Sequence, residues 1–519
     1  MCVVSNSLEM QMRPCNCSSH SLWIHLLLRG TTPSHTRFVL CLSRYPNLTT
    51  NAGRNHFYSY DIDHPAARKL WGIVLDAVAP AMAGHPGIVG WSLANEPGFS
   101  SANSTYTLAK FQAFLEQRYN DSVMAWSEAW GRRFHSFQDP LIMNYMGLWT
   151  MSTRQLLDWN AFNDQRAAQW YGFLCDRINT HYPDTAPTAC FIKSSNSASG
   201  LHPVAPHGEQ GIGRVQLVPV LDYRGCDTRI LPTSSSHFAI PSFPQTLYAM
   251  DWLPAASSYA LMRSLGGGRQ PVMETEWHSI STVTFRMEEI PSQHLRAARW
   301  LSHIHGMAAN MIWFWGREGW SGLPKMSHEF AGADFFRALP TQPHMLAEYA
   351  RGAVEVNAVG DYLVALAAQL PQLNLLYSPE SLVADPAHMD NLFGTYSLLH
   401  SLGVPVGFTT ARSAVDSSAT TAVPVVISGA SYVAPDVQEH LRLLHEAGTP
   451  VFVTGNRTNL FAFDDAGARS DPNMRDWAMT LPHMPMSVAD EATFQAFDAA
   501  LGPLLHRPVR CISLAGYTG

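Results

Sequence analysis

The sequence predicts a two-part α/β protein, in which a (β/α)8 TIM-type barrel precedes a doubly wound α/β module. Two observations lead to this fold class. Between residues 37 and 350, short apolar runs alternate with long amphipathic segments, as parallel strands covered by helices require. The alternation then restarts near Leu370 with shorter segments, which indicates a second, separate sheet.

Composition narrows the class of protein. Apolar residues make up 46% of the chain and charged residues only 14%, so large cores can be buried. The chain has 34 Lys and Arg against 41 Asp and Glu, a formal charge of −7. Nucleic-acid binding needs clustered basic residues, and a membrane span needs an apolar run of about 18 residues. We therefore expect no nucleic-acid partner and no membrane partner.

The barrel region divides into strands and helices. Pro65 lies in the first turn of a predicted helix, where its missing N–H has no cost, and Gly84 and Pro86 end that helix. Apolar residues at helical spacing, Leu108 and Phe111 among them, predict the next helix. In order, the predicted strands are 38–42, 88–93, 188–192, 271–275 and 309–315, and the predicted helices are 65–84, 107–119, 156–181, 259–265 and 292–305.

The second module repeats the alternation on a smaller scale. Its predicted strands are 373–377, 404–408, 423–427 and 451–453, and its predicted helices are 391–402 and 435–447, the last ended by Gly448. The strand exit at residues 377–381 lacks a glycine-rich phosphate loop. A structural or oligomerisation role is therefore favoured over a nucleotide or flavin cofactor. The predicted domains are 37–350 and 370–510, with residues 1–36 unassigned.

Eight cysteines are spread along the chain without a C-x-x-C pair. A structural zinc site is therefore not expected, no catalytic metal is indicated, and buried free thiols are the favoured interpretation. Five N-x-S/T sequons would accept glycans in a secreted protein, but residues 1–36 match no signal peptide, so localisation is left open. The sequons begin at Asn16, Asn47, Asn103, Asn120 and Asn456.

The sharpest local signal is the sequence GWSLANEP at residues 90–97. An apolar strand ends there in Asn95 and Glu96, and Pro97 prevents its continuation. Burial of a carboxylate at a strand end is costly unless the group is used or paired. In a barrel this Glu lies at the carboxyl end of the strands, where such folds carry their active sites. By itself, the motif is more often a capped turn.

A second predicted strand ends in carboxylates at residues 271–278, PVMETEWH. Glu274 and Glu276 are two residues apart, so we expect both to point the same way from the strand. A third strand end, MIWFW at residues 311–315, offers aromatic rings that can stack on a sugar. Each motif alone has an ordinary structural explanation, whereas all three in one α/β alternation indicate a glycosidase.

Two carboxylates at the mouth of one barrel are what retaining glycoside hydrolysis requires. One attacks the anomeric carbon as nucleophile, while the other protonates the leaving oxygen and then activates water. Their carboxyl groups need to lie about 5–5.5 Å apart. Apolar surroundings and a neighbouring carboxylate supply the raised pKa that such an acid needs.

These segments resemble the retaining glycoside hydrolases of clan A, and within that clan the family 42 β-galactosidase-like proteins. The sequence LANEP at residues 93–97 is similar to the clan's acid/base signature after strand four. Residues 111–130, FQAFLEQRYNDSVMAWSEAW, and the pair Asp158 and Trp159 resemble the stretch that follows it in the family. Residues 271–278 resemble the strand-seven nucleophile segment, and residues 425–455 resemble part of the family's flavodoxin-like trimerisation domain.

The resemblance implies a role for each matching residue. Glu96 is the implied acid/base. The nucleophile is either Glu274, which directly follows a strand Met as in some family members, or Glu276, which the spacing from the strand-opening Pro favours. The implied substrate-binding residues are Asn95 on the sugar 2-hydroxyl, Trp313 or Trp315 as the sugar platform, Tyr248 beside the nucleophile, and His278.

The N-terminal part departs from the family pattern. If residues 38–42 form barrel strand three, too few residues precede them, because two β/α units need about 60. The sugar-site Arg expected after strand two has no counterpart, and the small third β domain of many family members is absent. We therefore expect a barrel that is incomplete at strands one and two.

The sequence thus predicts a retaining, exo-acting β-glycosidase. It is expected to cleave terminal β-galactosides from an oligo- or polysaccharide substrate, without a cofactor and as a homotrimer. Another clan A activity, such as a β-mannosidase, β-glucanase or agarase, stays open. So does a non-catalytic carbohydrate-binding or assembly remnant, which would bind sugar without turnover.

Overall fold

The chain divides into two compact units. One comprises residues 1–193 and 207–222, and the other residues 194–206 and 223–519. The computed structural model describes residues 21–27, 35–41, 60–85, 88–95, 104–145, 151–184, 188–193, 215–226, 228, 230–232, 250–277, 292–312, 339–410, 423–455, 457–484 and 491–506. The predicted domain bounds, 37–350 and 370–510, stay predictions.

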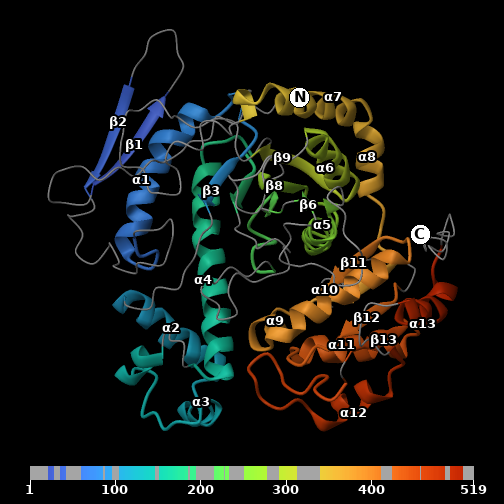
Figure 1. The fold of residues 1–519 in the computed structure, drawn as a ribbon. Coiled ribbons are helices and arrows are strands. Elements are labelled where there is room, and N and C mark those ends of the chain that lie inside the picture. The colour runs from blue at the N-terminus through green and yellow to red at the C-terminus, as the bar shows by residue number, and fades with distance from the viewer. Residues whose placement is uncertain are drawn as a thin grey trace. The chain divides into compact units, whose positions relative to one another are not determined.

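The first unit contains two pairs of strands and several helices. Strands β1 (Ser21–Leu27) and β2 (His35–Cys41) pair antiparallel, whereas β3 (Trp91–Asn95) and β4 (Cys190–Lys193) pair in parallel. Its helices are α1 (Pro65–Met82), α2 (Thr105–Arg118), α3 (Val123–Trp130) and α4 (Thr153–Asn179). Helices α1 and α4 pack side by side, as Figure 1 shows.

Local sequence signals determine where these helices begin. His64 Nδ1 caps α1 by accepting a hydrogen bond from Ala66 N (3.0 Å), and Pro65 occupies the first helical position. Ser152 and Gln155 form a reciprocal capping box at the start of α4. These caps satisfy N–H groups that the first turn of a helix leaves without a partner. The helices predicted at 65–84 and 156–181 are confirmed.

One apolar cluster holds strand β3 against helices α1 and α4. The indole N–H of Trp91 also donates to Tyr182 Oη (3.0 Å). Burial of this apolar surface and the indole bond fix the strand that ends at Asn95. The cluster contains Leu70, Val74 and Val78 of α1, Trp170 and Leu174 of α4, and the partly buried Trp91, Leu93 and Ala94 of β3.

Strand β2 differs from its predicted role. A strand does lie at the residues predicted as barrel strand three. Its described partner, however, is β1, in an antiparallel register that sets Ser21 opposite Cys41 and Leu27 opposite His35. Barrel strands are parallel. The described partner of β2 therefore comes from the segment that the sequence left unassigned, and not from a barrel strand.

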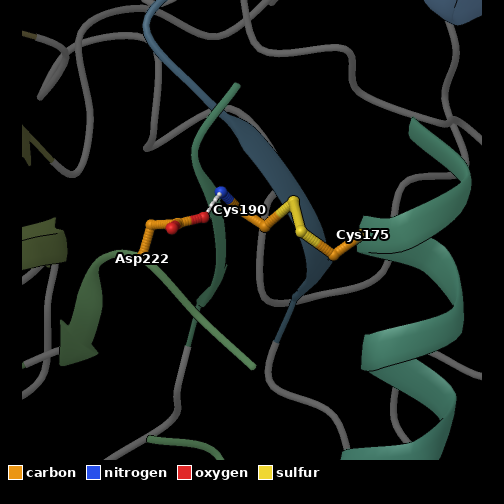
Figure 2. Close-up of side chains that lie close together, drawn as sticks. All are labelled: Cys175, Cys190 and Asp222. Carbon is orange, nitrogen blue, oxygen red and sulfur yellow. Dashed lines mark hydrogen bonds between the residues drawn. A yellow bond between two sulfur atoms is a disulfide. The ribbon is translucent and has the colours of Figure 1, made fainter. Parts of the chain in front are cut away.

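A disulfide joins Cys175 of α4 to Cys190 of β4 (Figure 2). The two Cα atoms are 6.0 Å apart, inside the usual range for such a bond. Asp222 lies beside the bond and accepts a hydrogen bond from Cys190 N (2.7 Å). The prediction of buried free thiols is therefore wrong for this pair. The pairing depends on how the chain returns from α4 into β4, which the cysteine spacing does not encode.

The second unit contains a three-stranded parallel sheet in the order β5–β8–β9. These strands are β5 (Arg224–Cys226), β8 (Val272–Trp277) and β9 (Met307–Ile312). Strands β6 (Leu231–Pro232) and β7 (Met250–Asp251) pair antiparallel. The helices of this part are α5 (Leu253–Leu265), α6 (Ser292–Ile304), α7 (Pro343–Ala358) and α8 (Gly360–Ala367). The strands and helices predicted between residues 259 and 312 are confirmed, and residues 313–315 of the last predicted strand lie outside the described residues.

A five-stranded parallel sheet follows, in the order β11–β10–β12–β13–β14. Numbered along the chain, this order is 2-1-3-4-5, which is the order of flavodoxin-like sheets. The predicted doubly wound module is confirmed. Its strands are β10 (Leu373–Leu376), β11 (Val406–Thr409), β12 (Val425–Ser428), β13 (Val451–Thr454) and β14 (His483–Met484), and its helices are α9 (Pro379–Ala384), α10 (Pro386–Ser401), α11 (Pro435–Glu446), α12 (Pro472–Thr480) and α13 (Glu491–Leu501).

No helix in the part of the chain that the structure describes combines the length and the apolarity that crossing a bilayer demands.

Candidate active site

For two predicted site residues, the structure describes both the backbone and the side chain. Glu274 and Glu276 belong to β8 and are buried, with 0% and 4% of their surface exposed. Asn95 ends β3, where its backbone is described and its side chain is not. Glu96 lies outside the described residues, so its distance from the nucleophile stays a prediction. The other predicted site residues outside the described residues are Tyr248, His278, Trp313 and Trp315.

Strand β8 lies in the middle of its sheet. Glu274 is level with Cys226, the last residue of β5, and with Asn310 of β9. Beyond Glu274 the pairing shifts, because Trp277 pairs with Ile312, only two residues past Asn310. Strand β8 therefore contains one extra residue, a β-bulge between Glu274 and Trp277. Bulges are frequent next to active sites, where they redirect a side chain.

The Glu274 carboxylate is held on both oxygens by Thr228. The Thr228 backbone N–H donates to Oε2 (2.9 Å), and the Thr228 hydroxyl donates to Oε1. Thr228 Oγ1 also lies 3.1 Å from Tyr259 Oη, which donates to Ser302 Oγ (3.3 Å). Such donors stabilise the charged form of a buried carboxylate. Glu274 thus belongs to a buried polar network that reaches helices α5 and α6.

The bulge between Glu274 and Trp277 interrupts the alternation of side chains along β8. Trp277 packs in the same buried cluster as Tyr259 of α5 and Leu295 of α6, so its ring faces the helices. The network of Glu274 reaches the same helices that Trp277 contacts. That both carboxylates point the same way stays a prediction, because the bulge interrupts the two-residue period on which it is based.

Trp277 also anchors the strand end next to Glu276. The Cζ atom of Arg299, in α6, lies 5.3 Å from the centre of the Trp277 ring. The same atom lies 4.1 Å from the ring centre of Tyr349, in α7. A guanidinium over an aromatic face is attracted by the electrons of the ring. Two helices thereby hold the end of β8 in place.

Two histidines of α6 are neutral beside this sheet. Burial lowers the pKa of His294, whose Nε2 atom lies 2.8 Å from Ile230 O. Burial likewise lowers the pKa of His303 to about 4, although a hydrogen bond with Met307 O opposes the shift. Both imidazoles are therefore uncharged at neutral pH, and neither offers a positive charge to the carboxylates of β8.

The exit of strand β10, in the flavodoxin-like module, is occupied by bonds within the chain. Ser378 and Ser381 both donate to Tyr432 O, at 2.5 and 2.7 Å. Tyr432 N in turn donates to Ser381 Oγ (2.9 Å). The hydroxyl groups that a ligand would bind at this edge are thus engaged with the segment after β12.

Among the described residues, one group of side chains lies close enough together to bind a metal ion: Cys175, Cys190 and Asp222 (Figure 2). Its two sulfur atoms are bonded to each other. Thiolates bind metals, and a disulfide offers none. The donor set of the oxidised protein therefore does not fit a metal.

Sequence reasoning did not find Thr228, Tyr259 or Ser302. Strand β5, which precedes Thr228, is three residues long and has the sequence RGC, so it carries no apolar alternation. Only its pairing with β8 brings Thr228 to Glu274. The resemblance pointed instead to Tyr248 as the neighbour of the nucleophile.

Comparison with known proteins identifies a family. The family model of glycoside hydrolase family 42, described as beta-galactosidase, matches residues 45–334. Comparison with curated proteins found no match.

Solved structures share the fold. An exo-carrageenase from Bacteroides ovatus has a TM-score of 0.71 and 21% identity, covering 89% of this chain and 61% of its own. A β-galactosidase from G. stearothermophilus has a TM-score of 0.62 and 16% identity, covering 83% and 61%. A β-galactosidase from Halorubrum lacusprofundi has a TM-score of 0.61 and 16% identity, covering 83% and 62%.

The chain therefore spans about three fifths of the length of these structures. The likeness confirms the predicted TIM-type barrel.

Proposed function

The chain belongs to glycoside hydrolase family 42, and from this membership we propose that it is a retaining glycosidase that cleaves terminal β-galactosides. The observation that carries the proposal is that strand β8 contains two buried carboxylates near its carboxyl end, Glu274 and Glu276. In a TIM barrel, active-site residues lie at the carboxyl ends of the strands.

In the proposed mechanism Glu276 attacks the anomeric carbon while Glu96 protonates the leaving oxygen. The resulting glycosyl-enzyme is then hydrolysed. The Glu96 carboxylate takes a proton from water, which displaces Glu276 and restores both groups. Asn95 binds the sugar 2-hydroxyl, and Trp313 or Trp315 stacks on the sugar face.

Glu274 has a positioning role in this proposal. A nucleophile needs an oxygen directed at the substrate, whereas both oxygens of Glu274 accept hydrogen bonds from Thr228. Glu274 is also fully buried. These contacts support Glu276 over Glu274 as the nucleophile, in agreement with the spacing argument from the sequence.

The substrate follows from the similar proteins. The family description and two of the solved structures favour a terminal β-galactoside. The exo-carrageenase, with its TM-score of 0.71, makes a carrageenan chain the second candidate. Assays with nitrophenyl β-galactoside and with carrageenan oligosaccharides distinguish the two.

The assembly is a separate part of the proposal. The β10–β14 module is proposed to form a homotrimer, and its flavodoxin-like strand order supports this. Analytical ultracentrifugation of the full chain measures the assembly. Detection of a monomer would contradict the proposed homotrimer, and it would not bear on the proposed hydrolase activity.

The decisive experiment compares Glu276→Ala with Glu274→Ala on nitrophenyl β-galactoside, with the β-glucoside and the β-mannoside as controls. We expect Glu276→Ala to abolish turnover, and azide to restore it, because an external anion can replace a missing nucleophile. Azide should not restore Glu274→Ala. Azide rescue of Glu274→Ala alone would reverse the assignment.

Two further outcomes address the rival functions. Faster hydrolysis of the β-mannoside or the β-glucoside would change the proposed substrate and leave the proposed mechanism as it is. Galactose binding by calorimetry, without turnover on any substrate, would support a non-catalytic carbohydrate-binding protein.

A further inference from the structure

The turn between α2 and α3 carries one of the five N-x-S/T sequons, at Asn120, Asp121 and Ser122. Asn120 and Asp121 have φ angles of 50° and 59°, a left-handed conformation that Asn and Asp tolerate better than most residues. Ser122 is the N-cap of α3, and its hydroxyl accepts a hydrogen bond from Ala125 N (3.1 Å). The sequon is therefore part of an ordered surface turn.

The turn does not use the Asn120 side chain. The Asn120 backbone N–H donates to Gln117 O (3.2 Å), while the side-chain amide is exposed and has no hydrogen bond among the described residues. Glycine would adopt the same backbone conformation without strain. The exposed amide nitrogen is thus available for chemical modification.

The disulfide is a second, independent observation in the same unit. Cys175 and Cys190 are both buried, and their bond links α4 to β4. Disulfides form and persist in oxidising environments such as the endoplasmic reticulum lumen and the cell exterior, and they are rare in the cytosol. One of these environments, the endoplasmic reticulum lumen, is also where N-x-S/T acceptors of secreted proteins are glycosylated.

We propose that this chain folds in an oxidising secretory compartment and that Asn120 receives an N-linked oligosaccharide there. In the transfer, the Asn120 amide nitrogen forms a bond to the anomeric carbon of a lipid-diphosphate-linked oligosaccharide. The lipid diphosphate leaves with the electron pair of the broken bond, and the amide loses one proton. The glycan would also cover Met124, an apolar residue of α3 that is 72% exposed.

The test uses the full chain isolated from the cells that make it, with free thiols blocked before lysis. Peptide-N-glycosidase in heavy-oxygen water converts a glycosylated Asn into a labelled aspartate, which peptide mass spectrometry locates. We expect the label at position 120, and a cross-linked peptide containing Cys175 and Cys190. An unlabelled Asn120 in a chain with an intact disulfide would overturn the glycan, and blocked thiols at both cysteines would overturn the compartment.

Matched variants expressed in the same cells separate the sequon from the turn. Asn120→Gly keeps the left-handed turn and removes the acceptor, so the label should disappear while the deglycosylated protein unfolds at the same temperature as the parent. Ser122→Thr keeps both the cap and the sequon, so the label should stay. Loss of the label in Ser122→Thr, or its persistence at that peptide in Asn120→Gly, would contradict the proposal.

Discussion

Strands β8 and β10 both belong to parallel sheets, but the residues at their carboxyl ends differ in chemistry. Strand β8 buries Glu274 and Glu276 in its last residues. Strand β10 ends in Leu376, and the Ser378 hydroxyl that follows it donates to Tyr432 O. One edge keeps ionisable groups and supplies donors to hold them, whereas the other satisfies its polar groups within the chain. We therefore expect catalysis at the carboxyl end of β8, where carboxylates are buried, and not at the carboxyl end of β10.

The largest expected effect is that of Glu276→Ala. If Glu276 is the nucleophile, kcat/KM for nitrophenyl β-galactoside should fall by about 10⁴-fold or more. Circular dichroism should change little, which would separate a loss of chemistry from a loss of folding. Activity close to that of the parent would remove the basis for calling this edge the reactive one.

Thr228→Val tests how the carboxylate of the β8 edge is held. The variant keeps the shape of the side chain but removes the hydroxyl that donates to Glu274 Oε1. A buried acceptor without its donor should lower the free energy of unfolding by about 1–3 kcal/mol, measured by urea denaturation. Tyr259→Phe, which removes a hydroxyl one step further away, should cost less. Equal losses would show that Thr228 has no special role.

Ser381→Ala makes the corresponding change at the β10 edge. It removes a donor to Tyr432 O and the acceptor of Tyr432 N. The free energy of unfolding should fall by about 1–2 kcal/mol. In contrast to Thr228→Val, kcat/KM should stay at the parental value. A large drop in kcat/KM would mean that the two edges are not functionally separate.

The last expected effect concerns acid. Burial lowers the pKa of His303, near β9, and of His388, in α10, each to about 4. Unfolded histidine has a pKa of about 6.5, so the unfolded chain binds more protons as the pH falls. The stabilisation is complete above about pH 6.5 and is lost towards pH 4. The unfolding temperature should therefore be lower at pH 5 than at pH 7.

His303→Asn and His388→Leu assign this acid sensitivity to one region or the other. Each variant should flatten the dependence of the unfolding temperature on pH between 7 and 5. If neither does, other groups dominate the acid response.

Local patterns in the sequence by themselves determined most of the secondary structure and two of the site residues. Helical spacing predicted α4, and Pro65 with Gly84 predicted the ends of α1, because apolar periodicity and helix-end signals act within a few residues. The strand-end carboxylates Glu274 and Glu276 were recognisable because a buried Glu in an apolar strand is costly unless it has a role.

Only the tertiary structure decided which segments pair and where side chains point. The bulge in β8 interrupts the side-chain alternation between Glu274 and Trp277, and the pairing of β5 with β8 brings Thr228 to Glu274. The bond between Cys175 and Cys190 likewise depends on the return of β4 to α4. Register and pairing join residues distant in the chain, so a one-residue shift reverses the face of a side chain without changing the local pattern.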